Sequence, residues 1–73
     1  MKKMKKEVKT AFAEDLRVLF NRLESLANRN ANVAARTMVL YQIDTFRRAL
    51  FLIGYGYNVD WDDDGAKVEI VKL

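Results

Sequence analysis

The periodicity of apolar residues changes once along this chain of 73 residues, at Gly54. Before Gly54, apolar side chains recur every three or four residues, which places them on one face of an α-helix. After Gly54 they alternate with polar residues, as in a β-strand with one buried face. The chain is therefore expected to form an α+β fold, with helices in residues 1–54 and strands in residues 55–73.

Two helices are expected in the first segment, because it contains two apolar stripes that each have the spacing 4, 3, 4, 3. The first stripe is Phe12, Leu16, Leu19, Leu23 and Leu26, and the second is Val39, Ile43, Phe46, Leu50 and Ile53. Residues 28–32 separate them and are rich in asparagine, which ends one helix and caps the next. So short a connection predicts an antiparallel helix hairpin. The first helix can begin at Thr10 or extend back through the lysines before it.

A C-terminal two-stranded β-hairpin is expected in the second segment. Its apolar face is predicted to pack against the helices and consists of Tyr57, Val59, Trp61, Ala66, Val68 and Ile70. Two registers are open. A four-residue loop 62–65 pairs Asp60 with Lys67, whereas a two-residue turn 64–65, the stronger local signal, sets Asp60 against the like charge of Glu69.

The length predicts a single domain, 1–73, in which residues 1–9 form a basic N-terminal tail that can fray. Removal of residues 1–6 is expected to leave the stability unchanged. A core of this size typically leaves only ~3–5 kcal/mol of net stability, so small proteins often add disulfides, a metal or a second subunit. The chain has no cysteine and no histidine, yet 51% of its residues are hydrophobic. A homo-oligomer, in the simplest case a dimer, is therefore expected.

The sequence contains few side chains suited to catalysis or to metal binding. The chain lacks histidine and cysteine, and its single serine, Ser25, lies within the first predicted helix, so no nucleophile–base pair is indicated. Residues 60–65 match the first half of a calcium-binding loop, but Val71 stands where a bidentate glutamate is needed. We therefore expect neither an enzyme, nor a cofactor, nor a metal site.

The N-terminal lysines are not followed by an apolar run, as they would be in a signal peptide. The most apolar stretch, residues 49–53, is far shorter than the ~20 residues of a membrane-spanning helix. A cytoplasmic protein that does not act on membranes is expected.

The second predicted helix carries a further set of residues opposite its main stripe. These are Leu40, Asp44, Arg47 and Phe51, which are spaced 4, 3, 4. A helix with two such faces in a short chain indicates a partner, and the simplest partner is another copy. We expect these residues to form the oligomer interface. Alternatively, they are ordinary surface residues, or one of them lies under the hairpin.

The acidic tip of the hairpin is a second candidate surface, for an unidentified protein partner, and consists of Asp60, Trp61, Asp62, Asp63 and Asp64. The leading hypothesis is a small non-catalytic protein–protein interaction module that acts as a regulator, adaptor or inhibitor, a kind common among phage-type accessory proteins. Residues 1–54 hold 11 Lys and Arg against 5 Asp and Glu. An alternative is therefore a nucleic-acid-associated protein that uses the basic helices and N-terminal lysines. In a third reading, the acidic tip mimics phosphates.

Overall fold

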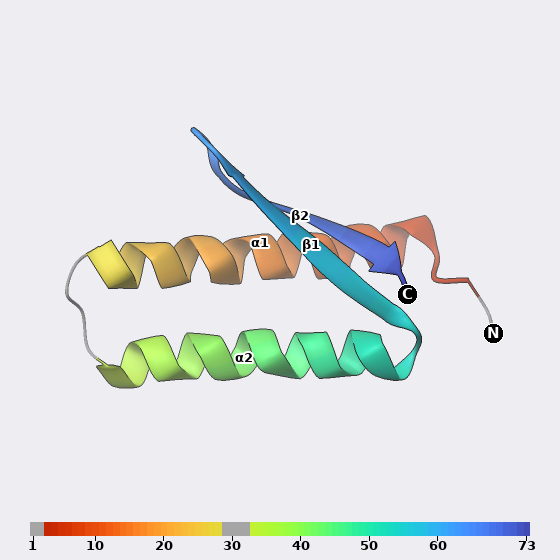
Figure 1. Ribbon diagram of the computed structural model, residues 1–73, viewed down its shortest axis with the longest axis horizontal. Coiled ribbons are helices and arrows are strands. Elements are labelled where there is room, and N and C mark those ends of the chain that lie inside the picture. Colours follow the sequence, from red (N-terminus) through yellow and green to blue (C-terminus); the bar gives the residue numbers. More distant parts are fainter. Residues whose placement is uncertain (1–2, 29–32) are drawn as a thin grey trace.

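The computed structural model describes residues 3–28 and 33–73, and it confirms the α+β fold. Two antiparallel helices, α1 (Lys6–Asn28) and α2 (Val33–Leu52), precede a hairpin of β1 (Tyr55–Asp62) and β2 (Gly65–Lys72) (Figure 1). Helix α1 thus begins within the lysines, the earlier of the two starts that the sequence allows. The predicted connection falls on residues 28–32, of which 29–32 lie outside the described residues.

Gly54 ends the helical part of the chain and redirects it into the hairpin. Its φ of 85° is a left-handed conformation, which glycine adopts without steric cost. The amide of Gly54 donates to the carbonyl of Phe51 over 3.0 Å, and its own carbonyl accepts from the amide of Leu73 over 2.9 Å. The strand ends are therefore tied to the end of α2.

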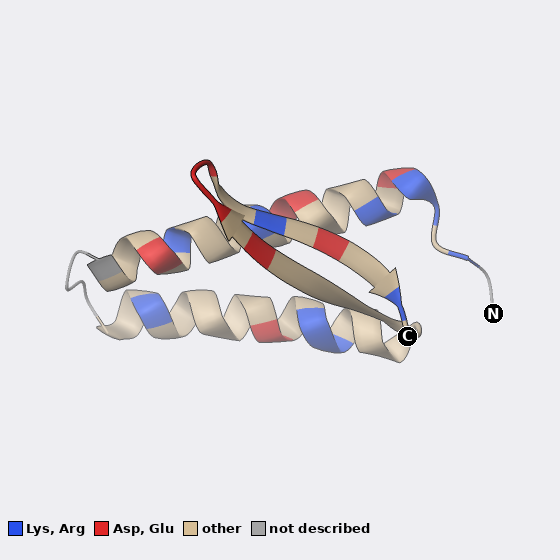
Figure 2. Ribbon diagram, turned by 45° about the horizontal axis from the view of Figure 1, so that its top comes forward, with Lys and Arg blue, Asp and Glu red and all other residues tan. Residues whose placement is uncertain are grey.

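The β-hairpin covers one face of the helix pair and leaves the opposite face open. It runs obliquely from the end of α2 toward and across α1, with β1 leaving the end of α2 and β2 lying mainly along α1 (Figures 1 and 2). The shortest extent of the Cα trace is 17 Å, which is room for two layers of secondary structure. The fold is thus a helix layer with a sheet layer on one side only.

The strands pair antiparallel in the first of the two predicted registers. Asp60 lies opposite Lys67, and the turn consists of Asp63 and Asp64 between the paired residues Asp62 and Gly65. Gly65 has a φ of 110°, which suits the last position of such a turn. The alternative turn at 64–65 is not formed.

The core lies where the helix pair meets the hairpin. Leu16 of α1 and Leu50 of α2 are fully buried. The other buried apolar residues are Val39, Ile43, Tyr55, Ala66 and Ile70. Both predicted helical stripes therefore supply the core, with one correction. Ile53 follows the end of α2 and is 46% exposed, because the chain has already turned away from the helix axis there.

No helix in the described part of the chain is both long and apolar enough to cross a bilayer.

Candidate interaction surfaces

The predicted interface on α2, here called the α2 flank, comprises Leu40, Asp44, Arg47 and Phe51. Leu40 is 46% exposed and Phe51 is 65% exposed. Arg47 donates to Asp44 over 2.7 Å, and this hydrogen bond raises the pKa of the guanidinium. The flank is thus accessible, but its two charges already satisfy each other within one chain.

The hairpin borders this flank on one side. Arg47 and Phe51 line a shallow hollow together with residues 55–58 at the start of β1. Burial raises the pKa of the nearby Tyr57 hydroxyl. The side chain of Phe51 therefore stands at the edge of the sheet layer and not on an isolated helical face.

The acidic tip is held in place by contacts with the rest of the fold. The Asp62 carboxylate accepts from Lys67 over 2.8 Å and from the amide of Asp64 over 2.8 Å. These two contacts hold the pKa of the Asp62 carboxyl below its ordinary value, with the lysine as the larger cause. Trp61 is half exposed, with its ring edge-on to Phe20 of α1 at a centroid distance of 6.4 Å.

The aspartates of the half-matched calcium loop are thus divided between different roles. Asp62 serves the turn, while Asp60 faces solvent from within β1, opposite Lys67. Within residues 3–28 and 33–73, the structure contains no group of three or more His, Cys, Asp or Glu side chains arranged to hold a metal ion.

The basic residues of the helices are interspersed with acidic ones (Figure 2). Arg17 pairs with Glu14 one turn earlier, and this hydrogen bond lowers the pKa of the Glu14 carboxyl. The ammonium of Lys9 lies 5.5 Å from the ring centroid of Tyr55, a cation–π distance. Some of the basic side chains, including Arg17 and Lys9, therefore make contacts within the fold.

The helix face opposite the hairpin contains a continuous apolar groove, here called the open groove. Three neighbouring hollows form it, and every residue lining them belongs to α1 or α2. Adjacent hollows share residues: Asp15 and Phe46 join the first to the second, and Gln42 joins the second to the third. The groove therefore follows the seam between the helices along most of its length.

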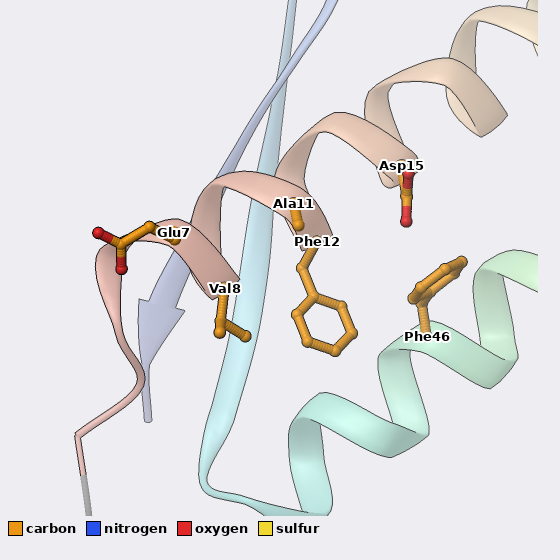
Figure 3. A pocket seen from close by; sticks show the side chains of 6 residues that line it. All are labelled: Glu7, Val8, Ala11, Phe12, Asp15 and Phe46. Carbon is orange, nitrogen blue, oxygen red and sulfur yellow. The ribbon is translucent and has the colours of Figure 1, made fainter.

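One end of the open groove lies near the start of α1. Figure 3 shows this hollow with both strands behind α1, so the view looks onto the face that the hairpin leaves open. Phe12 and Phe46 approach each other across the seam, edge to face, with ring centroids 5.7 Å apart. The volume of about 370 Å³ is at the small end of ligand pockets, which span ~300–1,000 Å³.

Large apolar side chains stand along this groove without cover from the hairpin. Val8 is 41% exposed, Val18 is 51% exposed and Met38 is 63% exposed. The charged residues that line the groove toward its middle are Asp15 and Arg22, both on α1. The groove residues contributed by α2 carry no charge and include Ala35, Met38, Gln42 and Phe46.

Sequence reasoning missed the open groove, although a signal for it exists. Beside the main stripe of α1 runs a second one with the spacing 3, 4, 3, 4: Val8, Ala11, Asp15, Val18 and Arg22. Because this stripe contains two charged residues, its sequence pattern resembles that of a solvent-exposed face.

Neither a family model, nor a curated protein, nor a solved structure matches this chain.

Proposed function

We propose that this protein is a small non-catalytic protein–protein interaction module that works as a homo-oligomer. The observation that carries the proposal is the open groove, because the hairpin covers only one of the two faces of the helix pair. In such a role the protein would act as a regulator, adaptor or inhibitor, through surfaces that remain available in the oligomer.

Physical chemistry supports a protein partner for this face. Complete burial of a valine- or methionine-sized side chain contributes ~1.5–3 kcal/mol relative to exposure. Val8, Val18 and Met38 are each about half exposed, so a partner that covers them recovers a substantial part of this free energy. A twofold oligomer gains it twice, because each residue is buried in both copies.

The composition of the groove supports binding over catalysis. Its hollow near the start of α1 combines apolar side chains with two carboxylates, Glu7 and Asp15, and the carboxylate of Glu7 points away from the hollow (Figure 3). General acid–base catalysis by two carboxylates requires contrasting environments for them, and both residues here are exposed.

Sedimentation equilibrium of the purified protein at concentrations from about 5 to about 200 µM tests the proposal. A dissociation constant at the lower end of this range corresponds to a binding free energy of roughly −7 kcal/mol, which a modest interface can supply. We expect a reversible increase from monomer to dimer mass over this range. A mass that stays monomeric at the highest concentration would contradict the homo-oligomer.

A further inference from the structure

The open groove carries a charge pattern that is complementary to itself. Asp15 and Arg22 are seven residues apart on α1, so they lie on the same helical face, separated by about 10.5 Å along the axis. Neither makes an ion pair with any residue in the described part of the chain. They lie symmetrically on either side of Val18 and Leu19.

This symmetry selects one way of placing a second copy on the groove. Consider a twofold axis that lies in the contact plane, perpendicular to the helices and level with Val18. This axis places α1 of one copy antiparallel on α1 of the other. Asp15 of each copy then faces Arg22 of the other. A twofold axis parallel to the helices would instead place α1 over the uncharged groove side of α2, and the two charges would have no counterpart.

We propose that two copies of this chain dock through their open grooves in this antiparallel arrangement, with reciprocal Asp15–Arg22 ion pairs on either side of Val18. The inference rests on the proposed function and deepens it by assigning the surface and the register. The resulting dimer is a four-helix bundle, sandwiched between two β-hairpins.

The shape of the groove fits the same arrangement. Antiparallel stacking places the end with Leu26 and Met38 over the hollow formed by Phe12 and Phe46 of the second copy. Met38 is the most exposed large apolar side chain in the groove, and its flexible thioether packs well against aromatic edges. In this arrangement the thioether of Met38 in each copy thus lies against the two aromatic rings of the other.

The α2 flank has no unpaired charges that would fix the register of a second copy placed on it. Its Asp44 and Arg47 are already paired within one chain, and its Phe51 borders the hairpin. A twofold contact there would also leave the open groove uncovered. The flank consequently provides matched control positions for the experiment.

The first experiment compares charge variants by sedimentation equilibrium, with circular dichroism to confirm folding. Asp15→Arg and Arg22→Asp each place two like-charge pairs in the dimer, so each should weaken dimerisation by about tenfold or more. The double variant Asp15→Arg/Arg22→Asp restores opposite charges and should return the dissociation constant to within about threefold of wild type. Equal weakening by the single and double variants would overturn the register.

The second experiment locates the surface. Val18→Asp should abolish the dimer, because it places two aspartates near the twofold axis, whereas Leu40→Asp on the α2 flank should leave the dimer intact. The chain contains no cysteine, so Val18→Cys and Leu40→Cys each introduce a single thiol. Under mild oxidation Val18→Cys should form a disulfide-linked dimer rapidly, and Leu40→Cys should not.

The outcomes separate this inference from the proposed function. A dimeric wild type that is dissociated by Leu40→Asp and cross-linked through Leu40→Cys would retain the homo-oligomer and overturn the open groove as its interface. A monomeric wild type would overturn both. If Val18→Asp fails to fold, the cross-linking comparison still decides the surface.

Discussion

The side-chain oxygen of Asn21 lies 2.8 Å from the backbone nitrogen of Ala66 and accepts its N–H. This hydrogen bond joins α1 to the first residues of β2, across 45 positions of sequence. The same oxygen also occupies the space beside Gly65, where an added Cβ would lie only 2.5 Å from it. The turn of the hairpin is therefore fixed on α1 by one polar side chain.

Replacement of Gly65 by alanine should destabilise the fold by ~1–3 kcal/mol. An L-residue at its φ of 110° is strained, and the new Cβ would also displace Asn21. Urea denaturation followed by circular dichroism measures the free energy of unfolding.

Gly56→Ala is the matched control for this prediction. Its added Cβ would meet the flexible end of Leu73 at 3.1 Å, and its backbone lies outside the left-handed region. We expect a change within ~0.5 kcal/mol, as for most substitutions that create no strain. Equal effects of the two substitutions would contradict the role of the turn.

Asn21→Ala should reduce stability by ~1 kcal/mol and should speed amide hydrogen exchange at Ala66 specifically. The substitution leaves the Ala66 amide without its acceptor in a partly buried site, which costs ~1–3 kcal/mol, and the better helix propensity of alanine offsets about 0.5 kcal/mol. Asn21→Asp retains an acceptor oxygen and serves as the control. Unchanged exchange at Ala66 in Asn21→Ala would show that the contact does not hold the turn.

The elements of this fold could be predicted from sequence because their signals are local. Periodicity located both helices and both strands, and Gly54 marked the change between them. Local rules do not decide the hairpin register, because the turn at 64–65 and the loop at 62–65 both satisfy them. The hydrogen bond between Asn21 and Ala66 helps to distinguish the two registers, and it joins residues that are distant in sequence.

The open groove could not be predicted, because it depends on which face of the helix pair the hairpin covers. Val18 and Met38 are apolar residues outside the main stripes, and sequence alone does not tell whether the sheet layer lies over them. The α2 flank is exposed at Leu40 and Phe51, as the sequence predicts. Its role as the oligomer interface competes with the open groove, and the Leu40→Asp and Leu40→Cys variants decide between the two surfaces.

The stability of the hairpin should fall at acidic pH through the Asp62–Lys67 ion pair. Folding lowers the pKa of the Asp62 carboxyl, chiefly through the hydrogen bond from Lys67, so the ionised carboxylate favours the folded state. This contribution is complete above the ordinary aspartate pKa of ~3.9 and is lost as the pH falls through the lower folded value.

Comparison of wild type with Asp62→Asn by urea denaturation at several pH values tests this prediction. The advantage of wild type should be constant above about pH 5 and should shrink between about pH 4 and pH 2. Asp63→Asn removes a charge from the same turn, where the Asp63 side chain makes no ion pair with the described residues, and it controls for net charge. Parallel curves for wild type and Asp62→Asn would contradict the assignment.

The segment before α1 contacts the core through Met4 and Tyr55. The amide of Met4 donates to the Tyr55 hydroxyl over 3.0 Å, and the Met4 side chain is half-buried against the core cluster. Tyr55 itself is only 3% exposed. The expectation that residues 1–6 are dispensable is therefore revised, since Met4 lies within them.

Tyr55→Phe should lower the free energy of unfolding by ~0.5–1.5 kcal/mol, because it removes the acceptor for the Met4 amide and keeps the ring in place. Tyr41→Phe removes a hydroxyl from a side chain that is 73% exposed, so it should leave the stability unchanged. Deletion of residues 1–5 should cost about 1 kcal/mol in wild type and less in the Tyr55→Phe variant, because the two changes remove the same hydrogen bond. Additive losses in urea denaturation would show that Met4 and Tyr55 act independently.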